Sequence, residues 1–265
     1  MRSLRRLVQA RKNHLMDSTI LVENTAQEFW ALAGTTSSYP CDIKTVITLT
    51  LPLELYPVAG LRVKDVLAWA ERIRLNCLIR GRDRRLHGCL IADRGKGTIF
   101  FDTLDHENEQ RFTLAHELAH FLLDYQAPRQ RALTILGETI LPVIDGDRPP
   151  TLAERLHAVL ITVPLGVMSH LMERPDEGLP SNIVIDIEDR ANRLALELLA
   201  PARPLQNVME QATTPRGFST RLAFLTELLI THSGLSGAIA TSYGHYLLRQ
   251  FGEPTFRDWL FRSAE

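Results

Sequence analysis

Two histidines and a glutamate stand close together at His116, Glu117 and His120, in the pattern His-Glu-x-x-His. In a helix, residues four positions apart lie one turn apart on the same face. The two imidazoles can therefore converge on one Zn²⁺, and Glu117 can act as a base toward a water that the metal activates. A closed structural zinc site does not need that glutamate, whereas a hydrolytic site does.

The residues around this motif are apolar on almost every side, which predicts a buried helix. They are Phe112, Leu114, Ala115, Leu118, Ala119, Phe121 and Leu122. Two histidines and a glutamate are not placed in a protein core without a partner, and a metal ion is the simplest partner. The alternative is a pair of surface histidines on an ordinary helix.

A catalytic zinc has three protein ligands, so a third ligand must come from another part of the chain. Glu188 is the best candidate, in a helix that we expect to end before Pro201. Asn192, one turn further on, can bond the second nitrogen of a ligating histidine. Alternatively, Glu188 only complements the helix dipole. Asp124, one turn after the motif, is the nearest rival, and the weaker ones are Glu138, Glu154 and Glu173.

The segments RFTLAHELAHFLL and EDRANRLALELLAP resemble the ImmA/IrrE family of metallopeptidases. By this resemblance His116, His120 and Glu188 are the metal ligands and Glu117 is the general base. The resemblance also implies an α+β, zincin-like fold, with a small β-sheet, the motif helix, surrounding helices and a C-terminal helical region. The 67 residues between His120 and Glu188 are a long gap for this family. The expected cofactor is Zn²⁺, although two histidines and a glutamate also suit Mn²⁺.

The activity implied by the resemblance is site-specific endopeptidase cleavage of an intracellular protein. The expected substrate is a helix–turn–helix transcriptional repressor, in stress response or mobile-element regulation. Residues 1–62 show no repressor-like pattern, so the repressor is expected to be a separate chain. The alternative from another class is a regulatory protein-binding module with a structural metal site. The presence of Glu117 argues against it, because a structural site would tolerate Gln there.

Composition and charge agree with an intracellular enzyme. The formal net charge is −1, so no global field attracts nucleic acid, and no direct nucleic-acid binding is expected. The three cysteines form no metal-binding pair and suggest no disulfide framework, which favours a cytoplasmic location. No stretch approaches 18 apolar residues, so no membrane span is expected.

The pattern along the chain divides it into three regions. Residues 1–20 are a basic arm, residues 21–205 are the catalytic domain with an insert at 126–182, and residues 206–265 are a helical region packed on the core. In the last region, residues 222–230 and 238–251 predict two helices around a tight turn.

Shorter elements are expected before and after the motif. Helices are predicted at residues 25–33 and 63–75, and strands at 77–79, 88–92 and 98–101, the last two joined by a glycine-rich hairpin turn. The last strand or its hairpin partner is expected to offer an open edge to an extended substrate. The insert should hold two helices, from Thr151 to about Val163 and at residues 167–173. They carry His157 and His170, either of which can face the cleft and stabilise an oxyanion, although a lone helix histidine is more often structural.

Overall fold

The computed structural model describes residues 19–34, 40–157, 159, 162–174, 190–212 and 217–252. They fall into two units. Asp42–Ser181 is here called the sheet unit, and Met1–Cys41 with Asn182–Glu265 is called the helical unit. These units are defined by compactness alone. The domain boundaries predicted after residues 20 and 205 therefore stay predictions.

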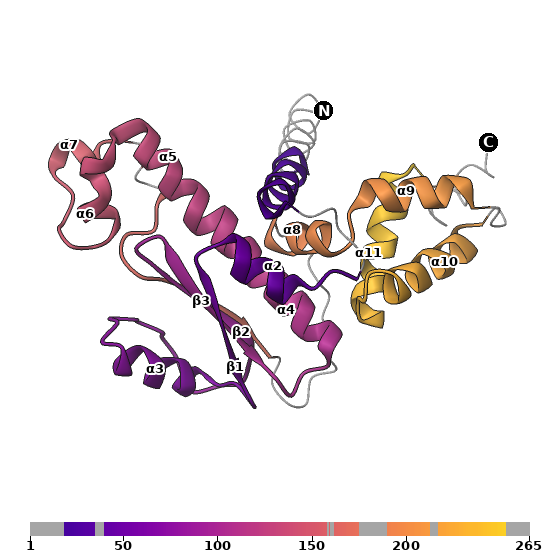
Figure 1. Ribbon diagram of the computed structural model, residues 1–265, viewed down its shortest axis with the longest axis horizontal. Coiled ribbons are helices and arrows are strands. Elements are labelled where there is room, and N and C mark those ends of the chain that lie inside the picture. Colours follow the sequence, from indigo (N-terminus) through magenta and orange to yellow (C-terminus); the bar gives the residue numbers. More distant parts are fainter. Residues whose placement is uncertain are drawn as a thin grey trace, which may run out of the picture. The chain divides into compact units, whose positions relative to one another are not determined.

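The sheet unit contains a four-stranded sheet with the order β1-β3-β2-β4 (Figure 1). Its strands are β1 (Leu53–Val58), β2 (Leu86–Asp93), β3 (Lys96–Asp102) and β4 (Met168–Glu173). β1 runs parallel to β3, whereas β2 is antiparallel to both β3 and β4. The two strands nearest the motif in sequence are therefore internal, and β4 forms one edge of the described sheet.

The predicted hairpin is confirmed as β2 and β3, and its turn is Arg94-Gly95. Both turn residues have positive φ angles, 49° and 80°. Two-residue turns of this kind match the right-handed twist of the strands that they join. The hairpin sets the register of the strands that lie beneath the motif helix.

Helices cover both faces of this sheet (Figure 1). On one face, α3 (Val63–Arg72) packs into an apolar cluster whose buried members are Leu61, Val63, Val66, Leu86, Cys89, Ile91 and Phe100. On the other face lies α4 (Glu107–His120), which contacts β2, β3 and β4 and is flanked by α2 (Ile43–Thr50). The motif helix therefore lies on the sheet beside a second helix, which itself contacts β1.

After α4 the chain continues as helix without a break. A π-helical segment at Phe121–Gln126 leads into α5 (Ala127–Leu136). A 3₁₀ turn at Glu138–Ile140 and the short helices α6 (Leu141–Ile144) and α7 (Leu152–Arg155) follow. A small apolar cluster consists of Ala132, Ile140, Val143, Ile144, Val159 and Val163.

Several predictions for short elements are wrong. Residues 168–173, which we predicted as part of a helix, form strand β4, because a short apolar run does not reveal its period. The capping box at Thr151 and Glu154 is confirmed, but α7 lasts only one turn. Residues 77–79 form no strand, and Cys77 and Ile79 instead pack against the α3 cluster. The expected open edge at the hairpin is also wrong, since β2 and β3 have neighbours on both sides.

All regular elements in the described parts of the helical unit are helices. Residues 19–33 are helical, followed in sequence by α8 (Arg190–Leu199), α9 (Ala202–Gln211), α10 (Phe218–Thr231) and α11 (Gly237–Gln250). The last two confirm the predicted helix pair. The predicted helix start at Thr25 is wrong, because its hydroxyl donates to the Leu21 carbonyl at 2.8 Å from within the helix. No helix in the described ranges is both long and apolar enough to cross a membrane.

Candidate metal centre

The motif helix is enclosed, as its apolar flanks predict. In α4 every residue from Arg111 to Ala119 is buried, and the Glu117 side chain is wholly inaccessible to solvent. An ionisable group in such a place is costly unless a charged or hydrogen-bonding partner compensates it. The burial of Glu117 therefore calls for a partner at its carboxylate.

Gly88 of β2 allows α4 to approach the sheet at this point. A Cβ atom at Gly88 would lie 2.4 Å from Cγ2 of Thr113 and 3.4 Å from Cγ of Glu117. The first distance is far below van der Waals contact, so any larger residue must push the helix away from β2. The missing side chain thus sets the position of Glu117 over the sheet.

We therefore expect Gly88→Ala to destabilise the protein by about 1–3 kcal/mol, the usual effect of overpacking a filled core. Urea unfolding measures the change. Thr113→Ser removes the clashing methyl group, so in the Gly88→Ala background it should restore part of the loss. Gly237→Ala is the control, because nothing lies within 4 Å of a Cβ there. Equal stability of Gly88→Ala and Gly237→Ala would contradict the close approach.

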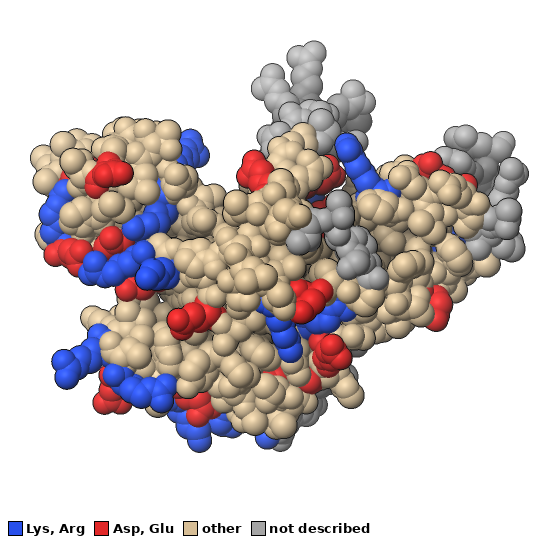
Figure 2. Space-filling view, in the orientation of Figure 1, with Lys and Arg blue, Asp and Glu red and all other residues tan. Residues whose placement is uncertain are grey.

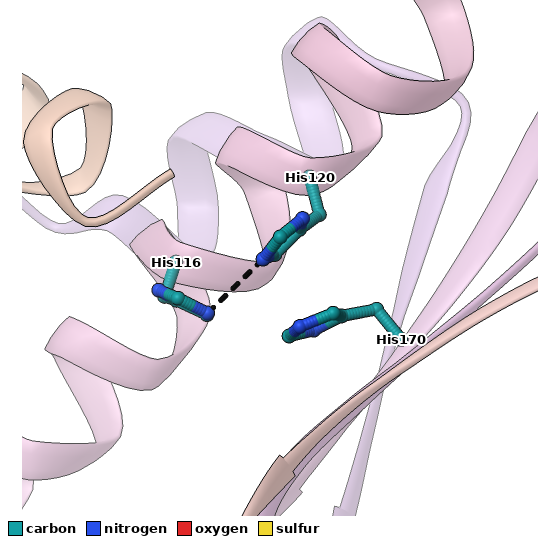
Figure 3. A group of neighbouring side chains, drawn as sticks. All are labelled: His116, His120 and His170. Atoms are coloured by element: carbon teal, nitrogen blue, oxygen red, sulfur yellow. Dashed lines mark hydrogen bonds between the residues drawn. The ribbon is translucent and has the colours of Figure 1, made fainter. Parts of the chain in front are cut away.

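The motif histidines have the spacing of two ligands of one ion. Their Nε2 atoms, joined by the dashed line in Figure 3, are 3.2 Å apart. Two nitrogens bound tetrahedrally to Zn²⁺ at the usual bond length lie about 3.3 Å apart. On its other nitrogen, Nδ1, His120 bonds Oδ2 of Asp124 at 2.7 Å. A carboxylate at that place fixes the tautomer and leaves Nε2 available to a metal.

Asp124 reaches His120 from the π-helical segment that follows α4. Such segments occur often at functional sites, because they shift the side chains of one turn. The bond to Nδ1 places Asp124 behind the imidazole, on the side away from the Nε2 pair. Asp124, the rival candidate for the third ligand, is therefore placed to orient the His120 ring.

A third histidine, His170 of β4, reaches the same place from the edge of the sheet (Figure 3). One nitrogen of each of the three histidines lies within 4.8 Å of the others. The His170 imidazole stacks on that of His120, with ring centroids 3.5 Å apart and an angle of 23° between planes. Its Nδ1 donates to Oε2 of Glu117 at 2.9 Å.

The two oxygens of Glu117 have different surroundings. Oε2 accepts from His170, whereas the buried Oε1 has no hydrogen-bond partner among the described residues. An unsatisfied buried carboxylate oxygen is rare, and a catalytic role is one explanation for it. Burial raises the pKa of the nearby Cys89 thiol well above its usual value, and the Glu117 charge raises it further. Cys89 is thus a neutral thiol.

The remaining predicted residues lie elsewhere or are not described. Glu188 falls among residues 175–189, outside the described residues, so its role as a ligand stays a prediction. Of the weaker rivals, Glu154 caps α7 and pairs with Arg148, Glu173 pairs with Arg84, and Glu138 is exposed. His157 is exposed after α7.

The sequence pattern does not place His170 at this centre, because residues 167–173 predict a helix. The signal that identifies it is strand alternation, which places every second residue of 168–172 on one face. Only the pairing with β2 fixes which face that is.

The fold is α+β, consistent with a zincin-like fold, and His116 and His120 of the motif helix together with His170 of β4 form a group that could hold a metal ion. Residues 80–139 match the model of the Peptidase_M78 family, described as the IrrE N-terminal-like domain. This match covers the motif helix and the hairpin before it, and it agrees with the resemblance seen in the sequence. No curated protein and no solved structure matches the chain. The matched range includes His116, Glu117 and His120 but ends before His170 and Glu188.

Proposed function

We propose that the protein is a Zn²⁺-dependent, site-specific endopeptidase in which His116 and His120 hold the metal and Glu117 is the general base. One observation carries the proposal. Glu117 is wholly buried beside two histidine nitrogens 3.2 Å apart, and one of its oxygens has no partner among the described residues. A structural site has no use for a buried carboxylate oxygen that lacks a partner, whereas a hydrolytic site uses that oxygen as a base.

The residues present fit a catalytic metal. When bound, Zn²⁺ would polarise the scissile carbonyl and acidify a water. Oε1 of Glu117 takes the proton of the attacking water and delivers it to the leaving amine. Asp124 keeps the His120 ring in the required tautomer by accepting from Nδ1. Glu188 remains the proposed third ligand on the strength of the family resemblance.

We further propose that the substrate is a separate helix–turn–helix repressor in the cytoplasm, cut at one exposed site in response to stress or a mobile element. The charges of the chain favour a protein partner over nucleic acid. On the face drawn in Figure 2, basic and acidic side chains of the described residues are interspersed, without a broad basic patch. Nucleic-acid binding depends on clustered Lys and Arg.

The test is to incubate the zinc-loaded protein with purified repressors, beginning with any short helix–turn–helix protein encoded beside its gene. We expect one cut in one repressor, complete loss of cleavage after removal of the metal with 1,10-phenanthroline, and recovery with added Zn²⁺. Casein is the control substrate and should be cut slowly at most, because a selective peptidase must exclude most proteins. A partner that binds tightly and is never cut would favour the binding module instead.

A further inference from the structure

Resting on the proposed function, we infer that His170 is a positioning residue that holds Oε2 of Glu117 and thereby directs Oε1 toward the reacting water. His170 stands outside the matched domain, on an edge strand that follows the motif by some 50 residues. It contacts both a proposed ligand and the proposed base, through ring stacking on His120 and a hydrogen bond to Glu117. His170 is therefore part of the candidate metal centre. Its geometry shows whether it is a metal ligand or a positioning residue.

The ring geometry argues against His170 as a ligand in company with His120. Two imidazoles bound to one tetrahedral zinc point outward from it, so their ring centroids lie about 5 Å apart. His116 and His120 meet this value at 4.7 Å. His120 and His170 do not, since their centroids are 3.5 Å apart and the rings are stacked nearly face to face. Ligation by His170 would require the stack to open.

The hydrogen bond explains what His170 does instead. A carboxylate on a helix can rotate about its last side-chain bond, and both of its oxygens accept protons equally well. The Nδ1–H of His170 donates to Oε2, which leaves only Oε1 for a water. Packing against His120 in turn limits the His170 ring. A base held in this way loses less rotational freedom when the substrate binds, so catalysis gains from its fixed geometry.

Two substitutions separate the hydrogen bond from the ring. His170→Phe keeps a ring that can stack on His120 but removes the donor. His170→Asn removes the ring but places its amide nitrogen where Nδ1 stands, two bonds from Cβ. Since Asn supplies nothing at the place of Nε2, it can replace a positioning histidine but not a histidine that ligates through Nε2.

The probes are Co²⁺ and acetohydroxamate, so that no protein substrate is needed. Co²⁺ replaces Zn²⁺ and reports the coordination geometry through its visible absorption. Acetohydroxamate chelates the metal, and its hydroxyl donates to the base carboxylate, so its affinity reports how Glu117 is held. The full-length wild-type protein and the two variants are each titrated with Co²⁺ and then with acetohydroxamate. Glu117→Gln is the reference for a lost base.

We expect both His170 variants to bind Co²⁺ within about threefold of the wild type, with the same spectrum. Acetohydroxamate should bind about tenfold more weakly to His170→Phe, because it must then order the Glu117 side chain itself, and nearly normally to His170→Asn. Loss of Co²⁺ affinity by tenfold or more in both variants would make His170 a ligand and overturn the inference. Equal acetohydroxamate affinity in wild type and His170→Phe would also overturn it. A wild-type protein that binds no Co²⁺ would instead overturn the proposed function.

Discussion

Replacing Glu117 with Gln is expected to leave the fold and the metal content unchanged and to reduce cleavage by about 10²–10⁴-fold. Gln has the same shape and can still accept from Nδ1 of His170, so the packing of this wholly buried residue is preserved. It has no basic oxygen, so the attacking water keeps its proton. Metal analysis, circular dichroism and cleavage of the identified repressor measure the three properties in one preparation.

The matched control is Glu173→Gln, which neutralises a carboxylate of the neighbouring strand β4 that pairs with Arg84. An exposed ion pair of this kind contributes little to stability, so this variant should cleave at the wild-type rate. The Glu117→Gln variant also separates the two classes of function. If cells that carry it behave as wild type, the protein acts through binding and the peptidase proposal is wrong.

The motif helix could be predicted from the sequence because several independent signals agree there. The spacing of His116 and His120 fixes a shared helix face, and the apolar residues around them require burial, which the structure confirms. The hairpin of β2 and β3 was predictable for a similar reason, since the turn glycine and the apolar runs on either side specify one local structure.

What the sequence did not reveal depends on contacts between distant segments. Strand β4 is six residues long and lies about 75 residues after β2, so its pairing cannot be deduced from local pattern. The role of Gly88 is hidden in the same way, because a glycine in a strand shows a close approach only once the opposing residue, Thr113, is known. The pairing of β4 with β2 brings His170 to the candidate metal centre, and the residues next to it in sequence do not predict this position.

Measurements of metal affinity in single variants identify the third ligand. The chain is expected to purify with about one divalent ion per molecule. His116→Ala and His120→Ala should lose it, because each removes a nitrogen whose position matches zinc coordination. Glu188→Gln should weaken metal binding by at least about tenfold, since a neutral amide oxygen is a much poorer ligand than a carboxylate. Competition with a chromogenic chelator gives the dissociation constants.

Asp124→Asn is the matched comparison for Glu188→Gln, because both exchange a carboxylate for its amide. The structure places the Asp124 carboxylate on Nδ1 of His120, where an amide oxygen can still accept the same hydrogen bond. We therefore expect Asp124→Asn to bind metal more tightly than Glu188→Gln does. The reverse order, with full occupancy in Glu188→Gln, would remove Glu188 from the site. Asp124 would then have to turn from the imidazole of His120 to the metal itself.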